Sequence, residues 1–185
     1  ETAALFADPL LRFKNRELRK KSAHVRCRVV DDASSAFDEL DRNCLHNVPI
    51  IGVRDAAYIH WRYVDKPGVS YTLIVAERGK QMAGFAVLKD RGELGDLIDV
   101  YPPTDPEVVD ALLREAVNIS VSRGYQRLRA RLLEHNPCID NLNRFGFKER
   151  GVSRPMYAYS ASGLAWSDAA GRGSSWYVWE GDRGG

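Results

Sequence analysis

Long apolar runs are absent from this 185-residue sequence. The longest stretches, such as Leu73 to Ala76, are far shorter than the roughly 18 residues that a membrane-spanning helix needs. No signal-peptide pattern opens the chain, so the sequence predicts a cytoplasmic protein without a membrane span. Because the chain begins with Glu1 and ends in a glycine-rich tail, we expect it to be a piece of a longer polypeptide.

Cysteine is also scarce, with only Cys27, Cys44 and Cys138. An odd number without the spacing of metal ligands predicts neither a disulfide framework nor a zinc site. We therefore expect ordinary reduced thiols and no metal cofactor.

The sequence has no large excess of either charge, since its net charge is only +2. Basic residues nevertheless crowd the stretch from Arg12 to Arg28, where Glu17 is the only acid. One interpretation is a solvated face of an N-terminal helix whose apolar stripe packs on a neighbouring domain or a second subunit. The other is a surface for a phosphate-bearing or membrane partner. We assign residues 1–23 to this basic helix or linker, or to the end of a preceding domain. We assign residues 24–185 to one domain.

Apolar periodicity and turn residues predict an alternation of strands and helices over the second of these parts. The predicted strands are Val25 to Val30, Ser70 to Arg78, Gln81 to Asp90, Leu94 to Val100, Tyr125 to Leu133 and Phe147 to Tyr159, with a last one at Trp176 to Trp179. The predicted helices run from Ser35 to Leu45, Arg54 to Val64, Pro106 to Arg123 and Asp140 to Phe145. Asp105 and Pro106 give the third helix a cap and a first-turn proline, and Gly124 ends it.

This order of elements and two sequence stretches resemble the GNAT acyltransferase superfamily. In the stretch Asn136 to Phe147, an asparagine opens a short helix that leads into Gly146-Phe147. The stretch Arg54 to Pro67, with its Trp-Arg-Tyr, resembles GNAT-like domains of bacterial proteins associated with surface-polysaccharide loci. The resemblance covers about residues 25–182.

The resemblance implies an α/β, GNAT-like fold with a central mixed, mostly antiparallel sheet flanked by helices. It also implies transfer of an acyl group from acetyl-CoA, or another acyl-CoA, to an amine on a small molecule or sugar. Such domains often occur in tandem, so a second GNAT-like domain or a homodimer is the expected protein partner.

Two family features are missing from this sequence. In the family, backbone amides of a glycine-rich loop at the start of the long helix hold the pyrophosphate of acyl-CoA. Here Tyr101 to Glu107 replaces that loop with three prolines and two acids, which remove donors and repel a phosphate. Leu142 stands where the family commonly has a tyrosine that protonates the departing thiolate.

Ten residues are candidates for a site nonetheless. Asp99 falls at the end of the strand that carries a carboxylate base in many relatives, although a salt-bridged structural carboxylate is an equal alternative. Tyr157 and Tyr159 share one strand face and are candidate acids, and the alternative is that both rings only pack in the core. For a cofactor we predict Val100, Tyr101, Asn136 and Asn141. For the substrate we predict His60, Arg62 and Tyr63, although neighbours on a helix point in different directions and Trp61 is expected in the core.

Three classes of function follow. The first is an active acyltransferase, fed by acyl-CoA or by a charged tRNA, as in GNAT-fold peptidyltransferases of cell-wall synthesis. The second is a degenerate GNAT-like domain that binds or scaffolds a partner, which accounts for both missing features. The third is an RNA-binding module, which the near-neutral charge and the lack of an aromatic RNA-binding strand motif disfavour.

Overall fold

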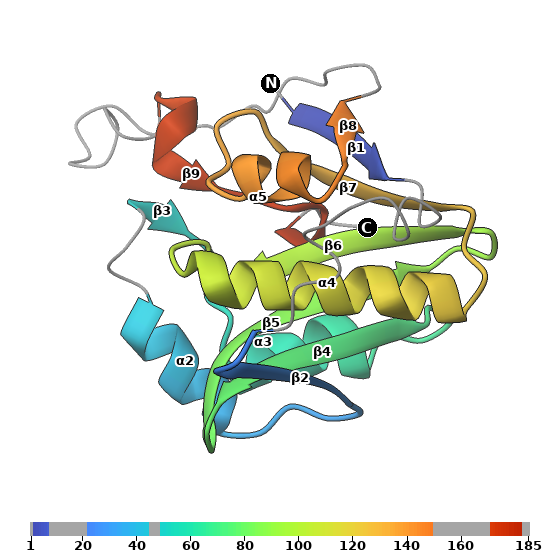
Figure 1. The fold of residues 1–185 in the computed structure, drawn as a ribbon. Coiled ribbons are helices and arrows are strands. Elements are labelled where there is room, and N and C mark those ends of the chain that lie inside the picture. The colour runs from blue at the N-terminus through green and yellow to red at the C-terminus, as the bar shows by residue number, and fades with distance from the viewer. Residues whose placement is uncertain (1, 8–21, 45–48, 150–170, 183–185) are drawn as a thin grey trace.

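The computed structural model describes residues 2–7, 22–44, 49–149 and 171–182 (Figure 1). Its centre is a sheet with the strand order β2-β4-β5-β6-β7-β1-β8. The strands are β1 (Thr2–Ala7), β2 (Val25–Val30), β4 (Tyr71–Arg78), β5 (Gln81–Asp90), β6 (Leu94–Tyr101), β7 (Arg127–Leu133) and β8 (Lys148–Glu149). Neighbours in this sheet run antiparallel except β6 and β7, which run parallel. The predicted fold, α/β with a mixed and mostly antiparallel GNAT-like sheet, is confirmed.

Helices cover both faces of the sheet. The long helix α4 (Pro106–Ser122) and the short α5 (Ile139–Arg144) lie on one face (Figure 1). The other face carries α2 (Ala36–Cys44), α3 (Ala56–Ile59) and the π-helical turn η2 (His60–Val64). Successive residues of β5 point to opposite faces of the sheet. Gly84 faces Val108 of α4, whereas the ring of Phe85 packs 5.3 Å from that of Phe37 in α2.

Helix α4 forms for the reasons that the sequence predicted. The Asp105 carboxylate accepts a hydrogen bond from the Val108 amide at 3.1 Å, and Pro106 occupies the first turn. Gly124, with φ of 72°, ends the helix in a left-handed conformation that suits glycine. Its apolar face is buried against the sheet.

The parallel strands β6 and β7 separate halfway along their length. Pairing between them is limited to residues Leu94–Leu97 of β6 and Arg127–Ala130 of β7. A bulge in β6 follows, since Val87 pairs with Asp99 and Leu88 with Leu97, which leaves Ile98 as the extra residue. Beyond it the strands continue to Tyr101 and Leu133 with a gap between them that another segment fills. This gap positions the candidate site.

Four short elements complete the described structure. Strand β3 (Ile50–Ile51) pairs in parallel with β9 (Trp176–Tyr177) in a separate two-stranded sheet. The single 3₁₀ turns η3 (Gly173–Ser175) and η4 (Glu180–Asp182) flank β9.

The structure departs from the sequence predictions in two places, and two further predictions lie largely outside the described residues. Strand β1, inserted between β7 and β8, and strand β3 were not predicted. Trp61, expected in the core, is 68% exposed, because η2 turns Arg62 and Tyr63 inward instead. Of residues 1–23, assigned to a basic helix or linker, residues 8–21 lie outside the described residues. Of the predicted strand Phe147 to Tyr159, only Lys148–Glu149 is described as a strand.

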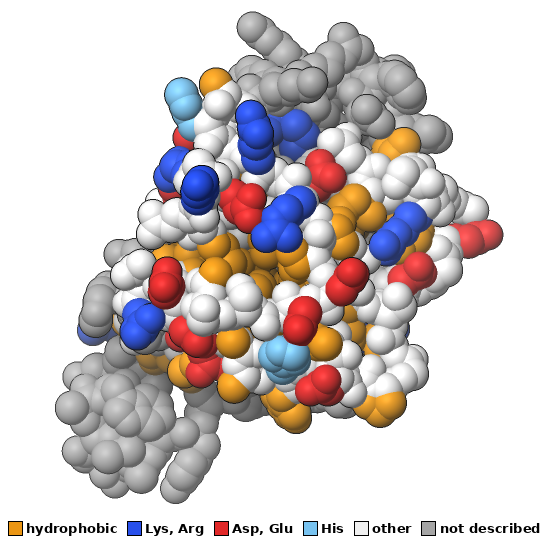
Figure 2. All heavy atoms as spheres, turned by 90° about the horizontal axis from the view of Figure 1, so that it is seen from below, with side chains coloured by type: hydrophobic (Ala, Val, Ile, Leu, Met, Phe, Trp, Pro, Cys, Tyr) orange, Lys and Arg blue, Asp and Glu red, His pale blue; other side chains and the backbone are white. Residues whose placement is uncertain are grey.

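On the face seen in Figure 2, acidic and basic side chains are interspersed and hydrophobic ones are visible between them. No single-sign field extends over the described part of that face, as the small net charge leads us to expect. In the described ranges, no helix combines the length and apolar character required to cross a membrane.

Gly84→Ala tests the close approach of β5 to α4. A Cβ at Gly84 would lie 2.5 Å from Val108 Cγ1 and 2.6 Å from the Tyr101 carbonyl oxygen. Because the strand and helix must move apart, we expect a loss of about 1–3 kcal/mol in the free energy of unfolding, measured by urea denaturation. Gly173→Ala is the control, since its Cβ meets its nearest neighbour at 3.4 Å and should change stability by less than about 0.5 kcal/mol. Equal effects at both positions would contradict the described packing.

Candidate functional site

The gap between β6 and β7 is filled by residues Trp176–Asp182, here called the closing segment. Trp179 forms an antiparallel bridge with Leu132 on β7. On the other side of the gap, the Tyr177 hydroxyl donates a hydrogen bond to the Val100 carbonyl of β6. The closing segment therefore binds the free edges of both strands where they have separated.

Gly181 is the tightest point of the closing segment. A Cβ there would lie 2.3 Å from the Tyr63 hydroxyl and 2.9 Å from the carbonyl oxygen of Ile98, the bulged residue. The Gly181 carbonyl accepts hydrogen bonds from Arg62 Nε at 2.8 Å and from the Tyr58 hydroxyl at 3.3 Å. Glycine is required at this position because any side chain would overlap Tyr63 and the β6 backbone.

A buried charge cluster lies beneath the closing segment. Arg54 is fully buried, and its Nε donates to Asp99 of β6 at 3.1 Å. Its Nη2 donates to both carboxylate oxygens of Asp182, at 2.8 and 3.1 Å, and Nη1 donates to the Gly52 carbonyl at 2.7 Å. The rings of Tyr101 and Tyr177 lie 5.4 and 5.5 Å from the guanidinium carbon. Arg54 thus joins the loop after β3, strand β6 and the closing segment.

Burial dominates the titration of this cluster. Removal from water raises the pKa of the Asp99 carboxyl to about 6, although Arg54 acts against the shift, and Asp182 reinforces it because two carboxylates share one guanidinium. Burial acts to lower the pKa of Arg54, but the two carboxylates together hold it above its ordinary value. Burial also raises the pKa of Tyr63, which donates a hydrogen bond to Asp99 at 3.2 Å, and that of Tyr177. Arg54 remains charged and both hydroxyls remain protonated.

The predicted base, Asp99, is therefore a salt-bridged carboxylate with no exposed surface. An attacking amine cannot reach it while the closing segment is in place. Asp96, three residues earlier on β6, is held by Arg129 at 2.6 Å and also by Arg91. Tyr157 and Tyr159 lie outside the described residues, so their proposed roles stay predictions.

The four residues predicted to hold a cofactor all bind other parts of the chain. Val100 accepts from Tyr177, and the Tyr101 hydroxyl donates to the Asp41 carboxylate at 3.1 Å. Asn136 accepts from the Cys138 amide at 2.9 Å, and its Nδ2 lies 3.5 Å from the Val178 carbonyl of the closing segment. Asn141 donates to Asp110 of α4 at 2.6 Å. Whether any of them holds a cofactor stays a prediction.

The three predicted substrate residues diverge as helical geometry requires. Arg62 and Tyr63 point inward and contact Gly181. His60 points elsewhere, with its Nε2 2.9 Å from the exposed Asp32 carboxylate. Only Arg62 and Tyr63 therefore meet at the cleft.

The start of α4, where the family holds a pyrophosphate, is occupied by the chain's own acids. Asp105 caps the Val108 amide, and Arg78 binds both Asp105 at 2.8 Å and Glu107 at 2.9 Å. Hydrogen bonds from Arg78 and the α4 amides hold the pKa of Asp105 below its ordinary value, although burial opposes them. The Tyr101-Pro102 bond before it is cis. Leu142, which replaces the family tyrosine, is fully buried.

Sequence reasoning missed the residues that build this site: Arg54, Tyr177, Gly181 and Asp182. The sequence predicts Arg54 only as the start of a helix and of the Arg54 to Pro67 stretch, and Trp176 to Trp179 only as a last strand. The sequence carries one weak signal, because aromatic residues closely precede Gly181-Asp182 after a glycine-rich stretch. The long sequence separation from Arg54 hid the contact.

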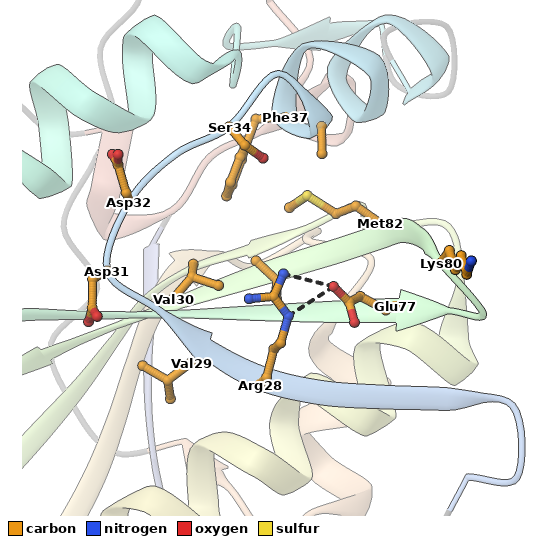
Figure 3. A pocket seen from close by; sticks show the side chains of 12 residues that line it. Arg28, Val29, Val30, Asp31, Asp32, Ser34, Phe37, Glu77, Lys80 and Met82 are labelled. Atoms are coloured by element: carbon orange, nitrogen blue, oxygen red, sulfur yellow. Dashed lines mark hydrogen bonds and ion pairs between the residues drawn. The ribbon is translucent and has the colours of Figure 1, made fainter.

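A second hollow of about 480 Å³ lies between β2, the start of α2 and the β4–β5 hairpin (Figure 3). Arg28 and Glu77 form an ion pair across its floor at 2.9 Å. None of its lining residues belongs to the Arg54 cluster. The described ranges contain no group of three or more metal-type ligands.

The chain is similar in fold to two solved structures. One is a functionally unknown conserved protein from Staphylococcus epidermidis, with 13% identity and a TM-score of 0.54, over 81% of this chain and 57% of that one. The other is the C-terminal domain (DUF2156) of a putative lysylphosphatidylglycerol synthetase from Agrobacterium fabrum, with 12% identity and a TM-score of 0.54, over 81% and 60%. The chain thus spans less than two thirds of either. No family model and no curated protein matches the sequence.

Arg54→Met tests the buried charge cluster. The substitution keeps an unbranched side chain but leaves Asp99 and Asp182 without their shared cation, so we expect a loss of about 3–5 kcal/mol in the free energy of unfolding. Arg28→Met is the matched control, because Arg28 is 60% exposed in its pair with Glu77 and should cost less than about 1 kcal/mol. Urea denaturation of both variants makes the comparison, and a small loss for Arg54→Met would refute the described cluster.

The pH dependence of stability tests the environment of Asp99. In the folded chain this carboxyl holds its proton up to about pH 6, whereas an ordinary aspartate releases it near 3.8. Its contribution to stability is therefore present at pH 4 and is lost as the pH rises through 6. Relative to Asp99→Asn, the wild-type chain should lose roughly 2 kcal/mol between pH 4.5 and 7.5. A wild-type advantage that grows with pH would mean that Arg54 holds the pKa low instead.

Proposed function

We propose that this chain is a GNAT-fold binding or scaffold domain, derived from acyl- or aminoacyl-transfer enzymes, in which the donor cleft is closed by the chain itself. The observation that carries the proposal is the closing segment, which takes the edges of β6 and β7 at the point where they separate. The similarity in fold to the Agrobacterium protein, a putative lysylphosphatidylglycerol synthetase, supports a transferase origin of the fold.

Closure and local charge both oppose acyl-CoA binding. An extended donor needs backbone groups on the separated strands, and Tyr177 and Trp179 already use those of Val100 and Leu132. A pyrophosphate at the start of α4 would meet the carboxylates of Asp105 and Glu107. Arg78 balances one of these two carboxylates, so a net negative charge remains where the pyrophosphate would lie.

Acyl transfer to an amine is the second candidate, and the position of Asp99 favours it. Asp99 follows the β6 bulge and has a pKa raised to about 6 by burial, which lies in the range useful to a general base. This function requires the closing segment to leave the cleft. Acetyl-CoA as donor, an amino sugar as acceptor and a link to surface polysaccharides are parts of this second proposal.

Calorimetric titration with acetyl-CoA and with free coenzyme A separates the two candidates. The binding-domain proposal predicts no saturable heat up to about millimolar ligand, weaker than about −4 kcal/mol. Saturable binding near micromolar, about −8 kcal/mol, would favour the acyltransferase, and Asp99→Asn should then abolish transfer. The Asp105→Asn, Glu107→Gln double variant is the control, because binding that appears only there would assign the exclusion to charge and not to closure.

A further inference from the structure

We propose that the cleft between β6 and β7 is a peptide-binding groove, that the closing segment is its resident ligand, and that a peptide of the same pattern supplied from outside can replace it. The inference deepens the binding-domain proposal by naming the ligand class of the cleft. It does not depend on whether acyl-CoA binds.

The first support is that groups on both separated strands, and on η2, bind the closing segment. Leu132 pairs with Trp179 through the backbone, and the Val100 carbonyl receives the Tyr177 hydroxyl. Arg62 Nε donates a hydrogen bond to the Gly181 carbonyl. One of these contacts, the Leu132–Trp179 bridge, is the kind of backbone pairing by which sheet edges bind peptides.

The second support is that the contacts define a sequence pattern. Tyr177 and Trp179, two positions apart, are both buried, as alternate residues of an extended segment can be. Two further positions along, Gly181 fits against Tyr63 only because it lacks a side chain. Asp182 then places its carboxylate on Arg54. A ligand must therefore supply two alternating aromatic residues, a glycine and an adjacent carboxylate.

The third support is that the segment is held by few local backbone contacts. Strand β9 pairs over two residues, and a single bridge joins Trp179 to β7. Within the part of the chain that the structure describes, Trp179 Nε1 is buried without a hydrogen-bond partner. Segments with few backbone bonds can open at lower free energy than the sheet beneath them. The buried rings of Tyr177 and Trp179 and the Asp182–Arg54 pair are the contacts that a replacing peptide must restore.

Cys138 reports whether the groove is occupied. It is fully buried, and its sulfur lies 3.8 Å from the Tyr177 hydroxyl. Burial raises the pKa of the Cys138 thiol to about 12, so the thiol is inert while the segment is in place. Cys27 on β2, near the opposite edge of the sheet, has its pKa raised to about 12 by burial as well and serves as an internal control.

The experiment uses the full chain with Asp182→Asn, which removes the carboxylate charge that Arg54 binds but keeps the side-chain shape. Alkylation by N-ethylmaleimide at pH 8, followed by peptide mapping, should be at least tenfold faster at Cys138 than in the wild type, with no change at Cys27. A synthetic peptide with the sequence of residues 171–182, acetylated and amidated at its ends, should restore the wild-type rate at Cys138. Asp65→Asn, at an exposed aspartate, is the matched control and should leave both rates unchanged.

A second peptide with alanine in place of the glycine that corresponds to Gly181 sets the specificity test. It should give no protection, because its methyl group would overlap the Tyr63 hydroxyl. Equal protection by both peptides, or none by the matching one, would overturn the groove. Equal acceleration at Cys27 and Cys138 would also overturn it, because the segment would then leave only when the whole domain unfolds.

Hydrogen exchange on the wild-type chain keeps the proposal falsifiable if Asp182→Asn does not fold. Backbone amides of Tyr177 to Gly181 should exchange at least tenfold faster than those of Ile98 to Tyr101 on β6. Equal rates for the two sets of amides would overturn the proposal.

Discussion

The guanidinium of Arg54 lies out of contact with water, bonded to Asp99 on β6 and to Asp182 in the closing segment. A charge buried in this way is tolerated only when its partners are in place, because each unpaired ion costs several kcal/mol. Closing the cleft therefore satisfies Arg54, and Arg54 in turn holds the segment closed. The position of Asp99 within the core follows from the same pairing.

This constraint explains why the features of the GNAT resemblance and the observed site differ. The separation of β6 from β7 and the bulge at Ile98 provide a cleft in the sheet. The cleft is nevertheless filled by aromatic rings of the same chain, and the start of α4 is neutralised by Asp105 and Arg78. A cleft that already holds a segment of the same chain is compatible with the proposed binding domain, and it makes the proposed transfer chemistry dependent on removal of that segment.

Much of the fold could be predicted from the sequence, because its strongest signals are local. The cap at Asp105, the stop at Gly124 and the hairpin at Gly79 act within a few residues, and the predicted elements around them match. Strand β1 could not be found this way, since it is defined by pairing with β7 more than a hundred residues away. The site was only partly predicted for the same reason: Asp99, Arg62 and Tyr63 were named, but Arg54 meets Asp182 across 128 positions.

The most direct test of the account is a nuclear Overhauser measurement on the unmodified chain in solution. If the closing segment fills the cleft, the ring protons of Tyr177 should give cross-peaks to Val100 and Cys138, and the Trp179 backbone should give cross-peaks to Leu132. Random-coil shifts for Trp176 to Asp182, with no cross-peaks to β6 or β7, would contradict it and would leave Arg54 and Asp99 at the base of an open cleft.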